Sequence, residues 1–298
     1  MSTCRASSAR RSRATRTTPA ITSRSKCARR PHWRSISGRS LRVLFLADVF
    51  GPAGRLAVEH RLPALRDELG VDVCIVNGEN VADGAGITGK LADRLLAAGA
   101  DVVTLGNHTF RRDGIGPYLE SSERVIRPAN WGARAPGRGM TVVQARNDVA
   151  VAVISLMGRL FIDVATSPWE MVDELVDEAR SRAPVVVVDF HAEATSEKIA
   201  IASWLDGRVT AVIGTHTHVQ TNDARILRGG TAAVTDAGMT GPHDSVIGVV
   251  AELAIRRMRT GLPVRFQPAE AGVRIEGVVV DCTDEGRATG IELVRVPV

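Results

Sequence analysis

The stretch Val185-Val186-Val187-Val188-Asp189-Phe190-His191 decides the fold class. Residues 184–190 are almost entirely apolar, and an imidazole follows at the point where the run stops. A short continuous apolar run is typical of a strand that is buried on both faces, as in a parallel sheet covered by helices. Helical periodicity is found on either side of it, at residues 168–182 and 195–205. The segment therefore predicts one helix–strand–helix unit of an α/β protein.

The same alternation extends in both directions along the chain. Further apolar strands are predicted at residues 41–47, 71–76, 101–105, 141–146, 149–156 and 208–213. Helices are predicted at 53–69 and 88–98, between the first three strands. The C-terminal part, 225–235 and 263–298, is predicted to be mainly strands, with one helix near 246–258. Buried strands that alternate with helices indicate a layered α/β fold.

Polar side chains follow five of these strands where each strand ends. They are Asp48, Glu79, Asn80, Asn107, His108, His191, His216 and His218. Because ligand sites of open α/β sheets form beyond the carboxyl ends of the strands, we expect these residues to meet in one crevice. A lone Asp after a strand is more often a turn or helix cap than a ligand. A lone His is usually a surface or satisfied core residue, and His32, His60 and His243 are interpreted in that way. The joint occurrence at five strand ends is the basis of the prediction.

The residue types at these ends predict a metal centre. Divalent iron, manganese and zinc accept imidazole and carboxylate ligands. Two carboxylates, two carboxamides and three or four imidazoles are too many for one tetrahedral zinc. They suit two metals that share a bridging carboxylate, the arrangement that recurs in phosphate ester hydrolysis. We therefore expect two divalent metal ions per chain, iron or manganese first and zinc second.

A second motif, at residues 84–91, resembles a nucleotide-binding loop. Its sequence G-A-G-I-T-G-K-L has the spacing G-x-x-x-x-G-K, but Leu91 stands where a hydroxyl must meet magnesium. We interpret its glycines as turn residues before a helix and do not expect nucleoside triphosphates to bind there.

The charge of the chain is concentrated in its first 40 residues. Of 38 Lys and Arg residues, 11 lie in residues 1–40, which contain no acidic residue; residues 41–298 keep 27 basic and 33 acidic side chains, a net −6. The net +5 therefore describes no folded basic surface, and nucleic acid is not an expected partner. The Arg- and Ser-rich segment 1–40 is predicted to be disordered. It could be a transit peptide, a nucleic-acid-binding arm, or upstream sequence that is not translated, with translation starting at Leu41. We favour the last, with residues 41–298 as the functional domain.

The remaining composition indicates a cytoplasmic protein. Residues 149–157 form the longest nearly apolar run, which is far shorter than the roughly 20 residues that cross a bilayer. The four cysteines, Cys4, Cys27, Cys74 and Cys282, have no C-x-x-C spacing and are predicted to be reduced thiols.

Seven motifs in order identify a family resemblance. They are L-A-D-V-F-G (46–51), N-G-E-N (77–80), G-N-H-T-F (106–110), R-P-A-N (127–130), D-F-H-A-E-A-T-S-E-K (189–198), G-T-H-T-H-V-Q-T (214–221) and T-D-A-G-M-T-G-P (235–242). Over about residues 41–295 the chain closely resembles the bacterial YmdB-like group of calcineurin-like metallophosphoesterases. The resemblance implies a four-layer α/β/β/α sandwich, and a homo-oligomer. It also implies hydrolysis of 2′,3′-cyclic nucleotides to 3′-nucleotides, by attack of a hydroxide that bridges two metals.

The resemblance also implies roles for individual residues. One metal would be held by Asp48, Glu79, Asn80 and His218, and the other by Glu79, Asn107, His191 and His216, with Glu79 bridging. His108 would protonate the leaving 2′ oxygen. The wider superfamily has D-x-H at the first strand, where this chain has Phe50 after Asp48, and it has Asp where this chain has Glu79. Both departures are shared with the YmdB-like group. Ala47, where the group often has Gly, is not expected to disable the site.

Three other functions remain open at the level of sequence. The ligand set defines phosphoester hydrolysis better than it defines the substrate, so another monoester or diester is an alternative. A second is a regulatory protein that responds to cyclic nucleotides with slow turnover. A third is nucleic-acid binding through residues 1–40, which predicts an affinity that falls with salt.

Overall fold

The computed structural model describes residues 40–146 and 148–298. The predicted tail, residues 1–40, lies outside the described residues except for Ser40, which begins the first strand. The strands are β1 (Ser40–Leu46), β2 (Val73–Asn77), β3 (Val102–Thr104), β4 (Val125–Ile126), β5 (Met140–Gln144), β6 (Ala150–Met157), β7 (Val185–His191), β8 (Ala211–Thr215), β9 (Arg225–Ile226), β10 (Ala232–Val234), β11 (Gly241–Pro242), β12 (Val273–Thr283) and β13 (Ala288–Pro297). The helices are α1 (Gly51–Leu69), α2 (Gly89–Ala97), α3 (Ile115–Ser121), the 3₁₀ helix η1 (Pro168–Glu170), α4 (Val172–Arg182), α5 (Thr195–Trp204) and α6 (Ala251–Thr260).

The strands form two sheets. The first has the order β11-β12-β1-β2-β3-β4, with β13 paired to β12, and the second has the order β5-β6-β7-β8-β10-β9. Strands β1 to β4 are parallel to one another, and so are β6, β7, β8 and β10. Every residue of β2, β7 and β8 is buried, as the continuous apolar runs predict.

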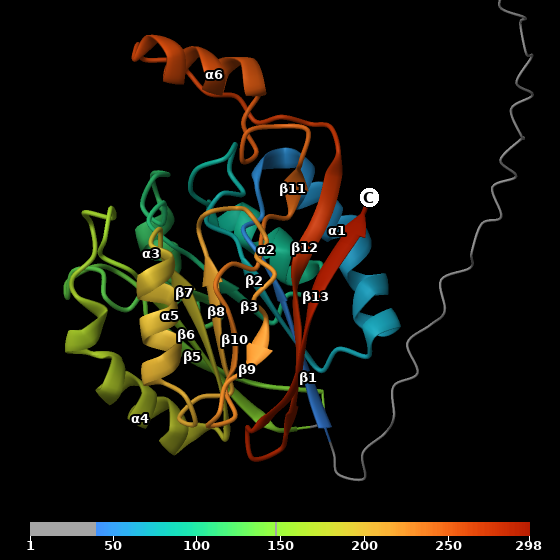
Figure 1. Ribbon diagram of the computed structural model, residues 1–298, viewed down its shortest axis with the longest axis vertical. Coiled ribbons are helices and arrows are strands. Elements are labelled where there is room, and N and C mark those ends of the chain that lie inside the picture. The colour runs from blue at the N-terminus through green and yellow to red at the C-terminus, as the bar shows by residue number, and fades with distance from the viewer. Residues whose placement is uncertain (1–39, 147) are drawn as a thin grey trace, which may run out of the picture. The chain divides into compact units, whose positions relative to one another are not determined.

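Three apolar clusters separate four layers. One cluster joins α1, α2 and α3 to the first sheet through residues such as Leu62 and Leu95. A second lies between the sheets and includes Phe45 and Val187, both 0% exposed. The third packs α4 and α5 on the second sheet. The predicted α/β/β/α sandwich is therefore the observed fold, and Figure 1 shows both sheets with their helices outside.

Several sequence-based boundaries were wrong. Helix α3 and strand β4 were missed, because seven and two residues are too short to show a periodicity. The helix expected at 246–258 begins only at Ala251, since residues 246–249 turn back on themselves, with Ile247 at φ 48°. Residues 263–272 were expected to be strand and form only one isolated bridge, at Pro268. Helix α6 stands out from the rest of the fold in Figure 1.

The parallel strands bring their carboxyl ends to one edge of each sheet. Asp48 follows β1, Glu79 follows β2, and Asn107 follows β3 in the first sheet, while His191 ends β7 and His216 follows β8 in the second. Because the two sheets pack face to face, these ends meet at the same end of the sandwich. None of the described helices is long and apolar enough to span a bilayer.

Candidate metal centre

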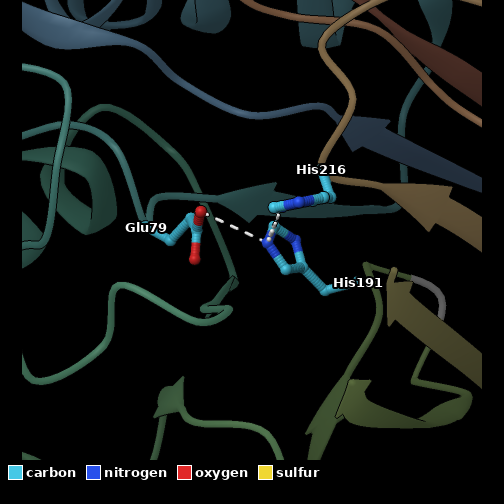
Figure 2. A group of neighbouring side chains, drawn as sticks. All are labelled: Glu79, His191 and His216. Carbon is cyan, nitrogen blue, oxygen red and sulfur yellow. Dashed lines mark hydrogen bonds and ion pairs between the residues drawn. The ribbon is translucent and has the colours of Figure 1, made fainter. Parts of the chain in front are cut away.

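The structure brings the predicted ligands together around His191. Its Nε2 atom lies 3.0 Å from Asn107 Oδ1, 3.2 Å from Glu79 Oε1 and 3.0 Å from His216 Nδ1. Figure 2 shows the side chains of Glu79, His191 and His216 converging. One ligand atom from each of these three residues lies within 4.8 Å of the others, so the group could hold a metal ion. Together with Asn107, these residues are the set expected for one of the two metals.

The second expected set surrounds Asp48. His218 Nε2 is 3.8 Å from Asp48 Oδ1 and 3.1 Å from the Asn80 amide nitrogen. Asp48 Oδ1 is buried and has no hydrogen-bond partner among the described residues, although Asp48 Oδ2 accepts a bond from the His216 amide. A buried carboxylate oxygen without a donor is costly unless a cation sits beside it. This observation fits a metal beside Asp48. Asn80 would bind that metal through its carboxamide oxygen, which requires the amide to turn from the orientation in the structure.

Glu79 lies between the two sets. Its Oε1 is within 3.2 Å of both His191 Nε2 and His108 Nδ1, and it accepts a hydrogen bond of 3.1 Å from the Asn80 amide. Its Oε2 accepts a bond from the His108 backbone N–H at 3.0 Å. The side chain is only 1% exposed. This central position is the one that a bridging carboxylate needs.

The buried charges shift one another's pKa values. Burial raises the pKa of Asp48 to about 6, and burial together with the neighbouring His191 lowers the pKa of His216 to about 3. Burial also disfavours charge on His191 and Glu79, but their attraction outweighs it. The pKa of His191 therefore rises to about 9, and that of Glu79 falls well below its usual range. Carboxylates and imidazoles forced together in this way are typical of functional sites.

Asp189 and Thr215 fix the orientation of His191. Asp189 is fully buried and accepts hydrogen bonds from Asn77, Thr104 and the Thr215 hydroxyl, at 2.9, 2.5 and 2.7 Å. Since the Thr215 proton points to Asp189, its oxygen can accept from His191 Nδ1, 2.9 Å away. A proton held on Nδ1 would leave Nε2 to bind a metal, in place of the second proton that the raised pKa of His191 otherwise keeps there against Glu79. Sequence reasoning used Asp189 only as part of the strand.

His108 stands beside the expected metal sets with one nitrogen occupied. Its Nδ1 is 2.7 Å from Asn80 Oδ1 and 3.2 Å from Glu79 Oε1, and its side chain is 26% exposed. The ring lines a cavity of about 640 Å³ that also contains Glu79, Asn80, His216 and His218. His108 is thus positioned by the buried residues and reaches the space where a substrate would lie.

The cavity wall includes residues that sequence reasoning did not assign. Glu193 lies 3.0 Å from His216 Nε2, and Arg111 and Arg257 bring positive charge to the wall. Phe50 packs edge-on against the His218 ring at 5.5 Å, in the position where the wider superfamily has a histidine. Glu193 lies inside the D-F-H-A-E-A-T-S-E-K block, two residues after His191, and this proximity was a signal that could have found it.

The loop at residues 84–91 serves the local fold. Gly84 and Gly86 adopt positive φ, 87° and 82°, and the Thr88 hydroxyl accepts a hydrogen bond from the Leu91 amide at the start of α2. A threonine cap on the first turn is a structural device. The interpretation of these glycines as turn residues agrees with this arrangement.

The two-sheet sandwich and the cluster of carboxylate, carboxamide and imidazole groups at its strand ends define a metallophosphoesterase. Within that class the chain belongs to the YmdB-like family, whose model, described as "YmdB-like protein", matches residues 44–294. The family expected from the sequence motifs is thereby confirmed.

Three relatives agree with this assignment. A 2′,3′-cyclic-nucleotide 2′-phosphodiesterase of Bacillus subtilis (strain 168) is 45% identical over 257 residues, which cover 86% of this chain and 97% of the relative. The crystal structure of a hypothetical protein from Thermus thermophilus has 40% identity and a TM-score of 0.81, covering 86% of this chain and 99% of its own. That of a novel phosphatase from Mycoplasma pneumoniae has 32% identity, also with a TM-score of 0.81, covering 87% and 94%.

Proposed function

We propose that this metallophosphoesterase hydrolyses 2′,3′-cyclic nucleotides to 3′-nucleotides with two divalent metals. The observation that supports it best is the convergence of Glu79, Asn107 and His216 on the buried Nε2 of His191. Asp48 Oδ1, which accepts no hydrogen bond from the described residues, lies beside this group. The Bacillus subtilis relative, which carries that activity in its name, supports the choice of substrate.

The proposed ligands form two sets that share one carboxylate. Asp48, Glu79, Asn80 and His218 would hold one metal, and Glu79, Asn107, His191 and His216 the other. Bound divalent metals, iron or manganese before zinc, would polarise the phosphoryl group and lower the pKa of a water molecule. The cavity of about 640 Å³ has room for a nucleotide, and Arg111 and Arg257 on its wall favour an anionic ligand.

His108 is the proposed general acid. Its Nδ1 lies 2.7 Å from Asn80 Oδ1 and stays against the carboxamide when that group turns its oxygen toward a metal, so Nε2 is the nitrogen that remains for the substrate. Protonation of the leaving 2′ oxygen by this nitrogen would release the 3′-nucleotide. Asn80 would therefore have two tasks: its carboxamide contacts His108 and also faces His218.

The test is turnover of 2′,3′-cyclic AMP with product identification. His108→Ala and Glu79→Ala are expected to remain folded and to lose at least about 10²-fold in turnover. For His108 this is the lower end of what one positioned acid contributes, and Glu79→Ala removes a ligand that both metals would share. His60→Ala, on the exposed face of α1, is the matched control and should behave like the parent. Parent-like turnover of either site variant with metal bound would contradict the assignment.

A substrate panel tests the specificity separately. With manganese or iron supplied, 2′,3′-cyclic nucleotides should be the best substrates, ahead of linear diesters, 3′,5′-cyclic nucleotides and monoesters. A strong preference for one of the others would keep the phosphoesterase class and reject the proposed substrate. A regulatory role with slow turnover would show as a cellular effect that survives loss of the metal ligands.

The setting proposed for the enzyme is a homo-oligomer in the cytoplasm. Apolar side chains that stay exposed on this chain, among them Met258 at 77% and Trp204 at 52%, suit burial against another copy. Cys74 and Cys282 are buried free thiols, which suits a reducing compartment. Sedimentation of the full chain tests the first point.

A further inference from the structure

A buried ion pair lies behind the loop that carries two of the proposed ligands. Lys198 Nζ and Asp236 Oδ2 are 2.8 Å apart, and their side chains are 4% and 1% exposed. Lys198 belongs to α5, which follows His191, and Asp236 follows β10. Removing two charges from water is expensive, and their attraction repays the cost only where the geometry is good and further hydrogen bonds satisfy the charged groups.

The Asp236 carboxylate is fully engaged by donors from the neighbouring loop. Besides the lysine, its Oδ2 accepts hydrogen bonds from the Thr217 backbone N–H at 3.0 Å and from the Thr217 hydroxyl at 2.7 Å. Its Oδ1 accepts from the Gly238 N–H at 2.9 Å. Thr217 is the residue between His216 and His218, so both of its bonds act on the short segment that joins these two imidazoles.

That segment has an unfavourable backbone conformation. His216 has φ 101° and His218 has φ 62°, in the left-handed region that non-glycine residues rarely adopt. Such conformations are unfavourable for residues with a side chain and persist only where surrounding contacts hold them. Here the contacts include Asp48, which accepts from the His216 N–H at 3.0 Å, and Asp236, which accepts from the Thr217 N–H. The His218 ring also lies 2.9 Å from the Ile247 carbonyl through its Nδ1.

Positive φ at His216 and at His218, on either side of Thr217, directs the two imidazole rings to different places. His216 Nδ1 lies 3.0 Å from His191, in one proposed ligand set, and His218 Nε2 lies 3.1 Å from Asn80, in the other. A loop free to relax would turn the rings away from these places. We propose that Asp236, charged and paired with Lys198, is a positioning residue that holds residues 216–218 so that one imidazole serves each metal.

This inference rests on the proposed assignment of His216 and His218 as metal ligands. Its central test variant is Asp236→Asn, which keeps the shape of the side chain. The NH₂ group of the new amide is a donor, and it would face other donors in either orientation: the Gly238 N–H, or the Lys198 ammonium and the two Thr217 donors. Lys198 would also lose its counter-charge. Thr217→Val removes only the hydroxyl donor, and Thr217→Ser keeps it as the conservative rescue.

The matched control is Asp101→Asn at the amino end of β3. Asp101 also accepts from a backbone N–H, that of Cys74 at 2.7 Å, and from a buried cation, Arg66 at 2.8 Å. Its replacement disturbs an ion pair of the same type next to no proposed ligand, although Asp101 is 28% exposed and Asp236 only 1%. A purely structural role of Asp236 predicts that both Asn variants lose stability and neither changes metal binding.

The readout is metal affinity of the full chain, measured with manganese by electron paramagnetic resonance and chelator competition. Asp236→Asn should bind manganese about 10- to 100-fold more weakly, the range found when a group that orients a ligand is removed. Thr217→Val should fall in the same direction, and Thr217→Ser and Asp101→Asn should match the parent. Affinity in Asp236→Asn equal to that of the parent would overturn the inference. A parent chain that binds no manganese, iron or zinc would instead overturn the proposed function.

Discussion

Gly106 is the position where a single methyl group should do most damage to the site. It ends the segment between β3 and Asn107, and a Cβ built on it would lie 2.3 Å from Glu79 Oε2 and 2.4 Å from His191 Nε2. Its φ lies outside the left-handed region, so alanine is acceptable to the backbone there. The effect of Gly106→Ala would therefore come from crowding of the proposed ligands alone.

The size of the disturbance follows from these distances. Real Cβ atoms essentially never approach heavy atoms closer than 3.0 Å, so the Glu79 oxygen and the His191 nitrogen must each retreat by about 0.6–0.7 Å. Metal–ligand distances tolerate only about 0.2 Å. We expect metal affinity to fall at least about 10-fold and turnover about 100-fold, the loss that a misplacement near 1 Å can cause. Overpacking should lower the free energy of unfolding of the metal-free protein by about 1–3 kcal/mol.

The assay combines chelator competition, turnover of 2′,3′-cyclic AMP and urea unfolding in EDTA. Gly132→Ala is the matched control, since a Cβ at Gly132 would meet nothing within 4 Å. This control should keep both affinity and turnover. Gly106→Ala with the metal affinity and turnover of the parent would refute the reasoning, because the methyl group would then lie beside the cluster without displacing it.

Three further outcomes are expected. Phe45→Ala, in the core between the sheets, should lower the free energy of unfolding by about 3–5 kcal/mol in urea, and a change below about 1 kcal/mol would contradict the buried position. Cys74 and Cys282 should resist iodoacetamide in the native protein and react only on unfolding, as peptide mapping can show, because burial raises the pKa of Cys282 to about 12 and that of Cys74 further. EDTA should abolish turnover and lower the Tm by about 5–10 °C, if metal had been present at about 100 times its Kd; an active metal-free enzyme would exclude the proposed mechanism.

The fold could be predicted where burial leaves a strong pattern. The run at Val185–His191 is a fully buried strand, and the continuous apolar residues alone showed it. Helix α3 has seven residues, too few for a helical period to stand out. The predicted helix included Ile247, which the structure places in a turn before α6. Its positive φ depends on contacts with distant residues, which a local sequence pattern does not contain.

The candidate site divides in the same manner. Asp48, Glu79 and His191 could be predicted to lie together, because each follows or ends a strand that its local sequence shows. Parallel strands in a sheet then bring these ends to the same edge. Asp236 meets Lys198 across 38 positions of sequence, and such pairing depends on how α5 and the loop after β10 are packed. The spacing of residues along the sequence does not predict this ion pair.

The division of the proposed ligands between the two sheets has a consequence for the life of the protein. Each metal, held as proposed, would bind side chains from both sheets and so link the sheets at the carboxyl ends of their parallel strands. A molecule without metal would open at this end of the sandwich more often. Proteases act on such openings. The abundance of the enzyme in the cell would then follow the metal supply, without any change in its synthesis.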